Sequence, residues 1–109
     1  MRKSHLLALG ALLTLVAIPA SAHAQDAAAL YKSKCAKCHG AAGKGDGSAA
    51  KTMKIEMKDL TDPKTLADVT DAKLTELFAK GEGKMPKYDT LKPEEVKALI
   101  GYVRSLSKK

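Results

Sequence analysis

The sequence has 109 residues, of which 19 are Lys or Arg and 12 are Asp or Glu, so the net charge is +7. It contains three Tyr, one Phe and no Trp, and side chains alone therefore supply little material for a hydrophobic core. Nucleic-acid binding is disfavoured despite the positive charge, because there are neither clustered aromatic residues nor a known nucleic-acid motif. A small domain of this composition needs a disulfide, a metal or a large buried ligand for stability.

The segment 1–24 is predicted to be a cleaved signal peptide. A positively charged start precedes an apolar run over 6–17, and the segment ends with the small-x-small pattern Ala22-His23-Ala24. Cleavage after Ala24 leaves one domain, residues 25–109, in the periplasm. The alternative is a retained membrane anchor, but a spanning helix needs about 20 apolar residues and Pro19 interrupts this run.

The two cysteines of the chain stand in the pattern Cys35-x-x-Cys38-His39. This is the attachment motif of c-type haem, in which two thiols form thioethers with the porphyrin and the adjacent histidine binds the iron. His39 is also the only histidine outside the predicted signal peptide. We therefore predict one covalent haem held by Cys35, Cys38 and His39.

Three other kinds of site could use this motif. A thioredoxin-like dithiol would need a βαβ pattern, which the Ala- and Lys-rich flanking sequence does not show. A structural zinc site needs four ligands, whereas the mature domain has only three Cys or His residues in total. A plain Cys35–Cys38 disulfide stays open as an alternative, although it leaves His39 without a role.

Along the mature domain the sequence predicts helices and no strand. The first helix is expected over 26–37 with Asp26 as its N-cap, and the glycine-rich stretch 40–47 is expected to be a loop. Residues 48–57 are ambiguous, and one short helix there would place Met53 and Met57 on one face.

The second half of the domain carries clearer helix signals. Thr61-Asp62-Pro63 is typical of a cap followed by proline, and it predicts a turn of helix through Asp68. The next helix is expected to be capped by Thr70 or Asp71 and to end at Gly81. The final helix is expected to open at Pro93 and to bury a stripe of apolar residues, namely Val96, Leu99, Ile100, Val103 and Leu106.

Three stretches resemble the class I c-type cytochromes, and together they span the whole mature domain. They are Ala27-x-x-x-Tyr31-x-x-x-Cys35-x-x-Cys38-His39-Gly40, Gly83-Lys84-Met85-Pro86, and Leu99-Ile100-Gly101-Tyr102-Val103-Arg104-Ser105-Leu106. The resemblance implies an all-α cytochrome c fold, with four or so helices around one haem and with the first and last helices crossing near Tyr31 and Tyr102. It also implies that Met85 binds the iron as its sixth ligand, opposite His39.

Some features bear on the ligand set that this resemblance implies. Ala27 stands where the family usually has glycine, so the crossing is expected to be slightly wider. No proline follows His39 before Pro63, so no backbone acceptor for the imidazole Nδ1–H is identified. Met53 and Met57 are rival ligands, for which packing in the core is favoured.

On this interpretation the protein is an exported one-electron carrier that works by outer-sphere transfer, with no catalytic residue and no membrane span in the mature chain. Six lysines lie near the motif or the Met85 loop in sequence: Lys32, Lys34, Lys37, Lys44, Lys84 and Lys87. They would steer a monomer toward acidic patches on membrane respiratory complexes or other redox proteins, or would simply solvate the surface. Two other roles stay open: a peroxidase-like or sensor haem protein, if Met85 does not bind iron, and a haem subunit of a larger assembly.

Overall fold

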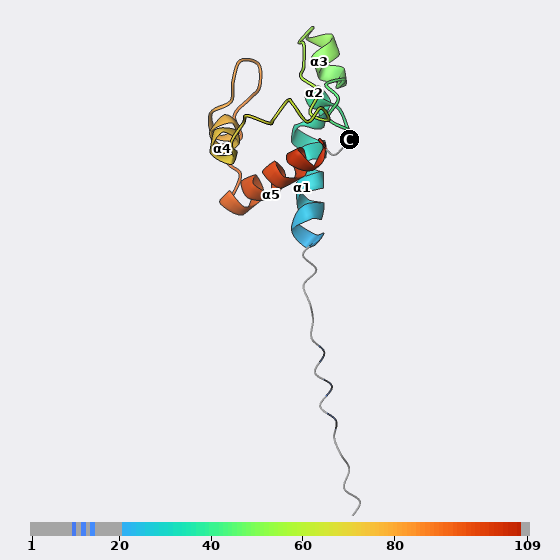
Figure 1. Cartoon of the computed structure of the whole chain (residues 1–109), viewed down its shortest axis with the longest axis vertical. Helices are drawn as coiled ribbons and strands as arrows, with labels where there is room; N and C mark the ends of the chain where they lie inside the picture. Colours follow the sequence, from blue (N-terminus) through green and yellow to red (C-terminus); the bar gives the residue numbers. More distant parts are fainter. Residues whose placement is uncertain (1–9, 11, 13, 15–20, 108–109) are drawn as a thin grey trace, which may run out of the picture.

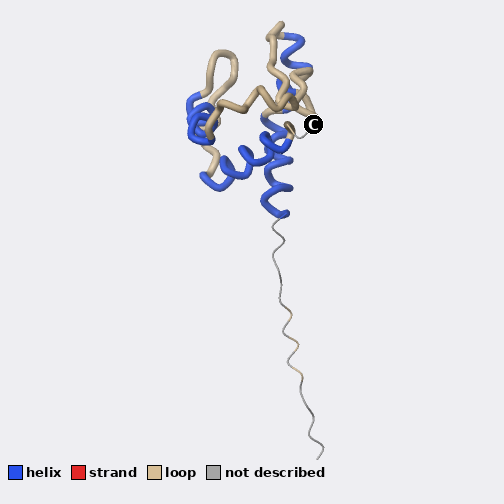
Figure 2. Tube along the Cα trace, viewed as in Figure 1, coloured by secondary structure: helices blue, strands red, loops and turns tan. Residues whose placement is uncertain are grey.

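The structure is a computed structural model, which describes residues 10, 12, 14 and 21–107. Within these residues the chain forms five helices: α1 (Ser21–Lys34), α2 (Ala36–His39), α3 (Ser48–Thr52), α4 (Asp71–Lys80) and α5 (Pro93–Ser105). The same residues contain no strand and only one isolated bridge, between Glu82 and Met85, so the predicted all-α class is confirmed (Figure 2). Most of the predicted signal peptide, 1–24, lies outside the described residues.

The core forms where α5 runs across α1 (Figure 1). The rings of Tyr31 and Tyr102 meet at this crossing, with centroids 5.2 Å apart and planes tilted by 48°. Tyr31 and Leu99 are each 1% exposed, and Ala27 is fully buried on the same helix as Tyr31. The crossing of the first and last helices at the two tyrosines is therefore confirmed.

The helices α4 and α5 begin where the sequence predicted. The Thr70 hydroxyl accepts a hydrogen bond from the Lys73 N–H, at 3.1 Å, which satisfies one of the free donors at the start of α4. Pro93 occupies the first turn of α5, and the Glu95 carboxylate accepts from the Lys92 N–H at 3.0 Å. Local capping chemistry was therefore enough to place both starts.

The prediction for the first helix was wrong at both ends. The helix α1 already begins at Ser21, so Asp26 lies inside it and is not the N-cap. Its Ala-rich sequence has high helix propensity on both sides of Asp26, and no residue there stops the helix. At the other end α1 stops at Lys34, and after a break at Cys35 the chain resumes as α2.

Before α4, the structure decides one region that the sequence left ambiguous and contradicts one prediction. The helix α3 ends at Thr52, because Lys54 adopts the left-handed conformation with φ +53°, and Met53 and Met57 therefore do not share a helix face. Successive turns replace the expected turn of helix over 61–68. There the Asp62 carboxylate accepts from the Lys64 N–H at 2.9 Å, a local bond that competes with helix formation.

Arg104 ties this irregular segment to α5. Its guanidinium donates to the Asp71 carboxylate at 2.7 Å and to the Val69 carbonyl at 2.6 Å. The segment before α4 is thus held against the last turns of α5. None of the helices in the described part of the chain is both long and apolar enough to cross a bilayer.

Candidate functional site

The motif residues lie on one tight turn. The break at Cys35 leaves its N–H donating to the Tyr31 carbonyl, at 2.8 Å, and its own carbonyl accepting from the His39 N–H at 2.9 Å. Cys35, Cys38 and His39 are therefore held together on the short helix that follows α1. Neither cysteine is disulfide-bonded in the structure, and Cys35 is the more buried of the two.

The glycine-rich loop folds back onto this turn. Gly40 has φ +87°, and a side-chain β-carbon there would collide with the Asp46 carboxylate. The Gly45 N–H donates to the His39 carbonyl at 2.7 Å, and the Gly47 N–H donates to the Cys38 carbonyl at 3.2 Å. The loop thus satisfies the free carbonyls at the end of α2 and fixes the turn that carries the motif.

Met85 is presented by a second tight turn. The N–H of Glu82 donates to the Met85 carbonyl at 3.1 Å, and the N–H of Met85 donates back to the Glu82 carbonyl at 2.9 Å. Gly81 enters this turn with φ +72°, and its missing β-carbon would lie 2.6 Å from the Met85 carbonyl oxygen. Only glycine fits there, because both the conformation and the space exclude a side chain.

Both turns open onto the same cavity, of about 170 Å³. The four residues predicted to hold a haem, Cys35, Cys38, His39 and Met85, all line it. The other lining residues are Lys34, Ile55, Met57, Glu82, Lys84, Pro86 and Tyr88. Of the two rival methionines, Met57 lines the cavity, whereas Met53 does not and is 48% exposed.

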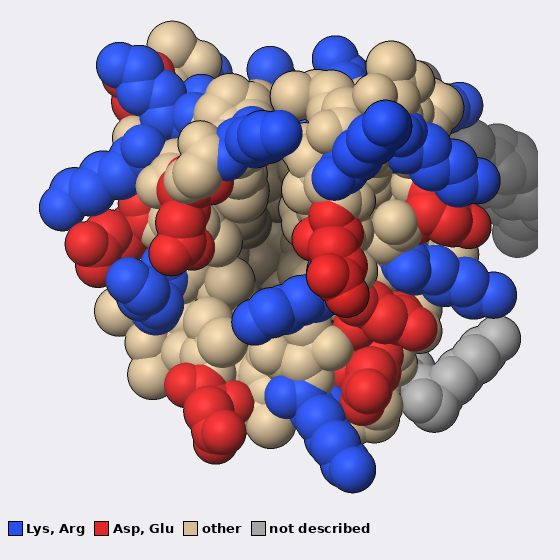
Figure 3. Space-filling model, turned by 90° about the horizontal axis from the view of Figure 1, so that it is seen from above, with Lys and Arg blue, Asp and Glu red and all other residues tan. Residues whose placement is uncertain are grey.

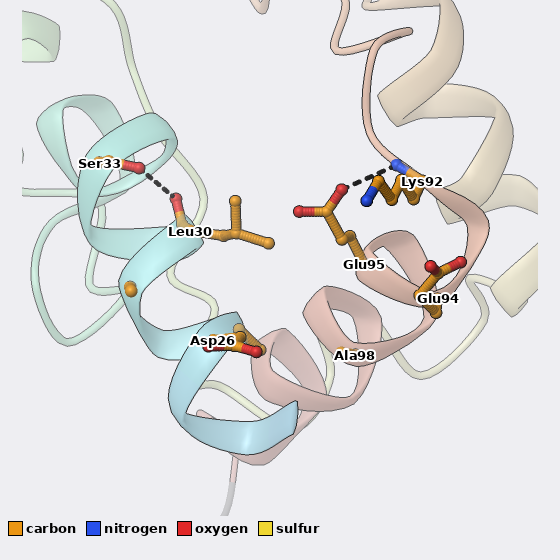
Figure 4. A pocket seen from close by; sticks show the side chains of 9 residues that line it. Asp26, Leu30, Ser33, Lys92, Glu94, Glu95 and Ala98 are labelled. Carbon is orange, nitrogen blue, oxygen red and sulfur yellow. Dashed lines mark hydrogen bonds between the residues drawn. The ribbon is translucent and has the colours of Figure 1, made fainter. Parts of the chain in front are cut away.

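A larger cavity, of about 650 Å³, lies between α1 and the start of α5 (Figure 4). Asp26 and Leu30 of α1 face Glu95 of α5 across it. In its wall, the Ser33 hydroxyl donates to the Leu30 carbonyl of the same helix, at 3.2 Å. None of the predicted site residues lines this larger cavity. The smaller cavity, which Cys35, Cys38, His39 and Met85 line, is therefore the candidate site.

Burial sets the electrostatics of the motif. It lowers the pKa of His39 and so favours the neutral imidazole, the form that binds metals. Burial also raises the pKa of the Cys35 thiol to about 11, opposite to the lowered pKa of redox-active dithiols, and the thioredoxin-like alternative is disfavoured. The Nδ1 atom of His39 is buried without a hydrogen-bond partner. The sequence identified no backbone acceptor for the N–H at this position, and the structure provides none either.

The tyrosine of α1 supports the motif from behind. The Tyr31 hydroxyl donates to the Gly40 carbonyl at 2.7 Å, which links the helix crossing to the residue after His39. Burial first, and then the neighbouring Cys35 thiol, raises the pKa of Tyr31 to about 12. The hydroxyl therefore stays protonated and keeps donating up to strongly alkaline pH.

This set of residues fits a haem better than a bare metal ion. Among the described residues, no group of three or more His, Cys, Asp or Glu side chains is placed to hold a metal. Two unpaired thiols on one turn, a neutral imidazole and a thioether instead match covalent attachment and axial ligation of a haem. The walls formed by Ile55, Met57 and Pro86 add apolar surface suited to a porphyrin.

Charge around the cavity is mixed. Lys34 and Lys84 line it, together with the acidic Glu82. The space-filling view shows a hollow with Lys and Arg side chains at several points around it and Asp and Glu side chains between them (Figure 3). One of the six lysines singled out from the sequence, Lys87, is paired with Asp89 at 3.6 Å.

A protein-family model matches residues 22–103, from the start of α1 to the last turns of α5. The family is described as cytochrome c oxidase, cbb3-type, subunit III. No curated protein matches the chain. The family match covers every element that lines the candidate site.

Proposed function

From the premise that this chain belongs to the cytochrome c family described as cbb3-type cytochrome c oxidase subunit III, and so is a haem c electron-transfer protein, we propose that it is an exported monohaem carrier of single electrons. The observation that carries the proposal is the shared cavity, where the turn bearing Cys35, Cys38 and His39 meets the turn bearing Met85.

Each of these four residues has a distinct role. Cys35 and Cys38 would hold the haem covalently through two thioethers, and His39 and Met85 would be the ligands of its iron. When bound, the haem iron supplies the one-electron redox couple. The Met85 thioether is a soft, neutral ligand that favours the ferrous state. With His39 and Met85 both serving as ligands, the iron would have no position left for a substrate, and this ligand set supports electron transfer rather than catalysis.

The electron passes to a partner protein by outer-sphere transfer, without any bond between the two proteins. Lys34 and Lys84 are the basic residues of the cavity wall, so they are best placed to approach an acidic patch. The family description points to redox partners within respiratory complexes. Opposite charges speed such encounters most at low ionic strength.

Export with cleavage after Ala24 is compatible with the fold. The cut removes the first four residues of α1, which precede every residue of the core, and leaves Asp26 near the new helix start. A negative charge there stabilises the positive end of the helix dipole. The mass of the protein in the periplasmic fraction should correspond to a chain starting at Gln25. Recovery of the uncleaved chain in the membrane would instead establish an anchor.

Attachment and ligation are tested together by optical spectra of protein expressed with the haem-attachment machinery. Wild type should carry haem that survives denaturing electrophoresis and, when oxidised, should show the weak far-red charge-transfer band of methionine-ligated ferric haem. Cys35→Ala and Cys38→Ala should each lower the yield of covalent haem. Met85→Ala should keep the covalent haem and lose the far-red band.

Met53→Ala is the matched control, because Met53 is exposed and lies outside the cavity. It should leave both haem attachment and the far-red band unchanged. Retention of the band in Met85→Ala and its loss in Met57→Ala would transfer the ligand role to Met57. Absence of covalent haem in wild type would refute the proposed function as a whole.

A further inference from the structure

The segment that follows Met85 is joined to α1 by Tyr88. The Tyr88 hydroxyl donates to the Lys34 carbonyl at 2.7 Å, across 54 positions of sequence. Its backbone N–H donates to the Phe78 carbonyl in α4, at 2.6 Å. Tyr88 therefore connects the loop bearing Met85 both to α4 and to the residue directly before Cys35.

The acceptor of this bond is a carbonyl that the helix itself leaves free. The last carbonyls of an α-helix have no partner within the helix. Past Lys34, the N–H groups of Cys38 and His39 both donate to the Cys35 carbonyl instead. The Tyr88 hydroxyl fills the place of the missing donor, and the Lys34 ammonium lies 5.7 Å from the centre of the Tyr88 ring. The contact therefore combines a hydrogen bond with a cation–π interaction.

The Met85 loop has few other attachments. Its other residues Glu82, Gly83, Lys84, Pro86 and Lys87 are all exposed. Among the side-chain hydrogen bonds of the described residues, that of Tyr88 is the one that joins this loop to α1. Tyr88 also lines the cavity beside Met85, so this bond lies between the Met85 loop and the helix that leads into the motif.

Building on the proposed function, the geometry points to Tyr88 as a positioning residue, whose hydroxyl holds the Met85 loop at the distance from α1 that iron ligation by Met85 requires. Loss of the hydroxyl leaves the ring in place but frees the loop to move away from the cavity. Met85 then leaves the iron more readily, and an added ligand competes with it more successfully.

The test uses Tyr88→Phe in the haem-loaded protein, with titration of imidazole as the competing ligand. The far-red band reports how much Met85 remains bound, and far-UV circular dichroism separately reports global unfolding. One hydrogen bond contributes about 0.5–1.5 kcal/mol, so imidazole should displace Met85 at about 2- to 10-fold lower concentration than in wild type.

Tyr102→Phe is the control, because it makes the same chemical change in a ring that packs on Tyr31 at the helix crossing. It should leave the imidazole titration unchanged. Equal imidazole titrations for Tyr88→Phe and wild type would refute the positioning role, even if the thermal midpoint fell. A wild-type protein without the far-red band would refute ligation by Met85 itself, so the two failures are distinguishable.

Discussion

Replacing Gly47 by alanine should push the glycine-rich loop away from the turn that carries Cys35, Cys38 and His39. Gly47 has φ −63° and ψ 145°, a conformation open to any residue, so the substitution carries no backbone strain. The added β-carbon would collide with the Lys37 carbonyl oxygen and lie 2.6 Å from the carbonyl carbon of Cys38. These are backbone atoms of α2, which cannot rotate out of the way as a flexible side chain could.

The cost follows from the displacement that is needed. Overpacking of this kind destabilises by about 1–3 kcal/mol. The lower entropy of the unfolded alanine chain offsets about 0.4–1 kcal/mol of that loss. A net loss of about 1–2 kcal/mol should lower the thermal midpoint by about 4–16 °C for a domain of this size.

The assay is thermal and urea unfolding of the haem-loaded protein, followed by far-UV circular dichroism. Gly101→Ala is the matched control, since a β-carbon at Gly101 meets no atom within 4 Å and the residue lies in the interior of α5. It should raise stability by about 0.5–1 kcal/mol. If Gly47→Ala were as stable as Gly101→Ala, the close approach of the loop to α2 would not exist in solution.

Two further substitutions test the supports of the fold. Arg104→Ala should lower the free energy of unfolding in urea by about 1–2 kcal/mol, because the hydrogen bond to the Val69 carbonyl is lost. The more exposed ion pair with Asp71 adds little to this loss. An unchanged urea midpoint would contradict the stabilising role of Arg104. Burial raises the pKa of Tyr31 to about 12, above the value of about 10 in the unfolded chain, so its stabilisation is complete below about pH 10 and is lost as the pH rises toward 12. The free energy of unfolding in urea, measured across that pH range, should therefore fall less in Tyr31→Phe than in wild type. Parallel curves of this free energy against pH would contradict the contribution of the Tyr31 hydroxyl.

Features that depend on neighbouring residues could be predicted from the sequence. The starts of α4 and α5 follow from Thr70 and Pro93, whose capping and φ preferences act within one turn. The motif Cys35-x-x-Cys38-His39 is likewise local and could be identified from its spacing, but the break between α1 and α2 at Cys35 was not predicted. Met85 was added only by family resemblance, and the structure brings it to the same cavity.

Features that depend on distant contacts could not be predicted, and neither could some local ones for which the sequence pattern fits two structures. No local signal relates Tyr88 to the Lys34 carbonyl, 54 positions away, or places Met57 in the cavity wall. The turns over 61–68 depend on side-chain bonds to the backbone, which a cap-and-proline pattern does not distinguish from a helix start. Asp26 failed as a cap because capping residues also occur inside helices when both flanks favour the helix.

The crossing of α1 and α5 also has a consequence for the order of events during biosynthesis. Tyr102 follows its partner Tyr31 by 71 positions, so the core closes only after the chain has been made as far as Tyr102. Closing a loop of this length carries an entropic cost that contacts between neighbouring residues do not carry. Cys35, which is buried in the finished core, therefore stays open to solvent throughout that interval. The contact between α1 and α5 that stabilises the domain therefore leaves time for the thiols to react before the core has closed.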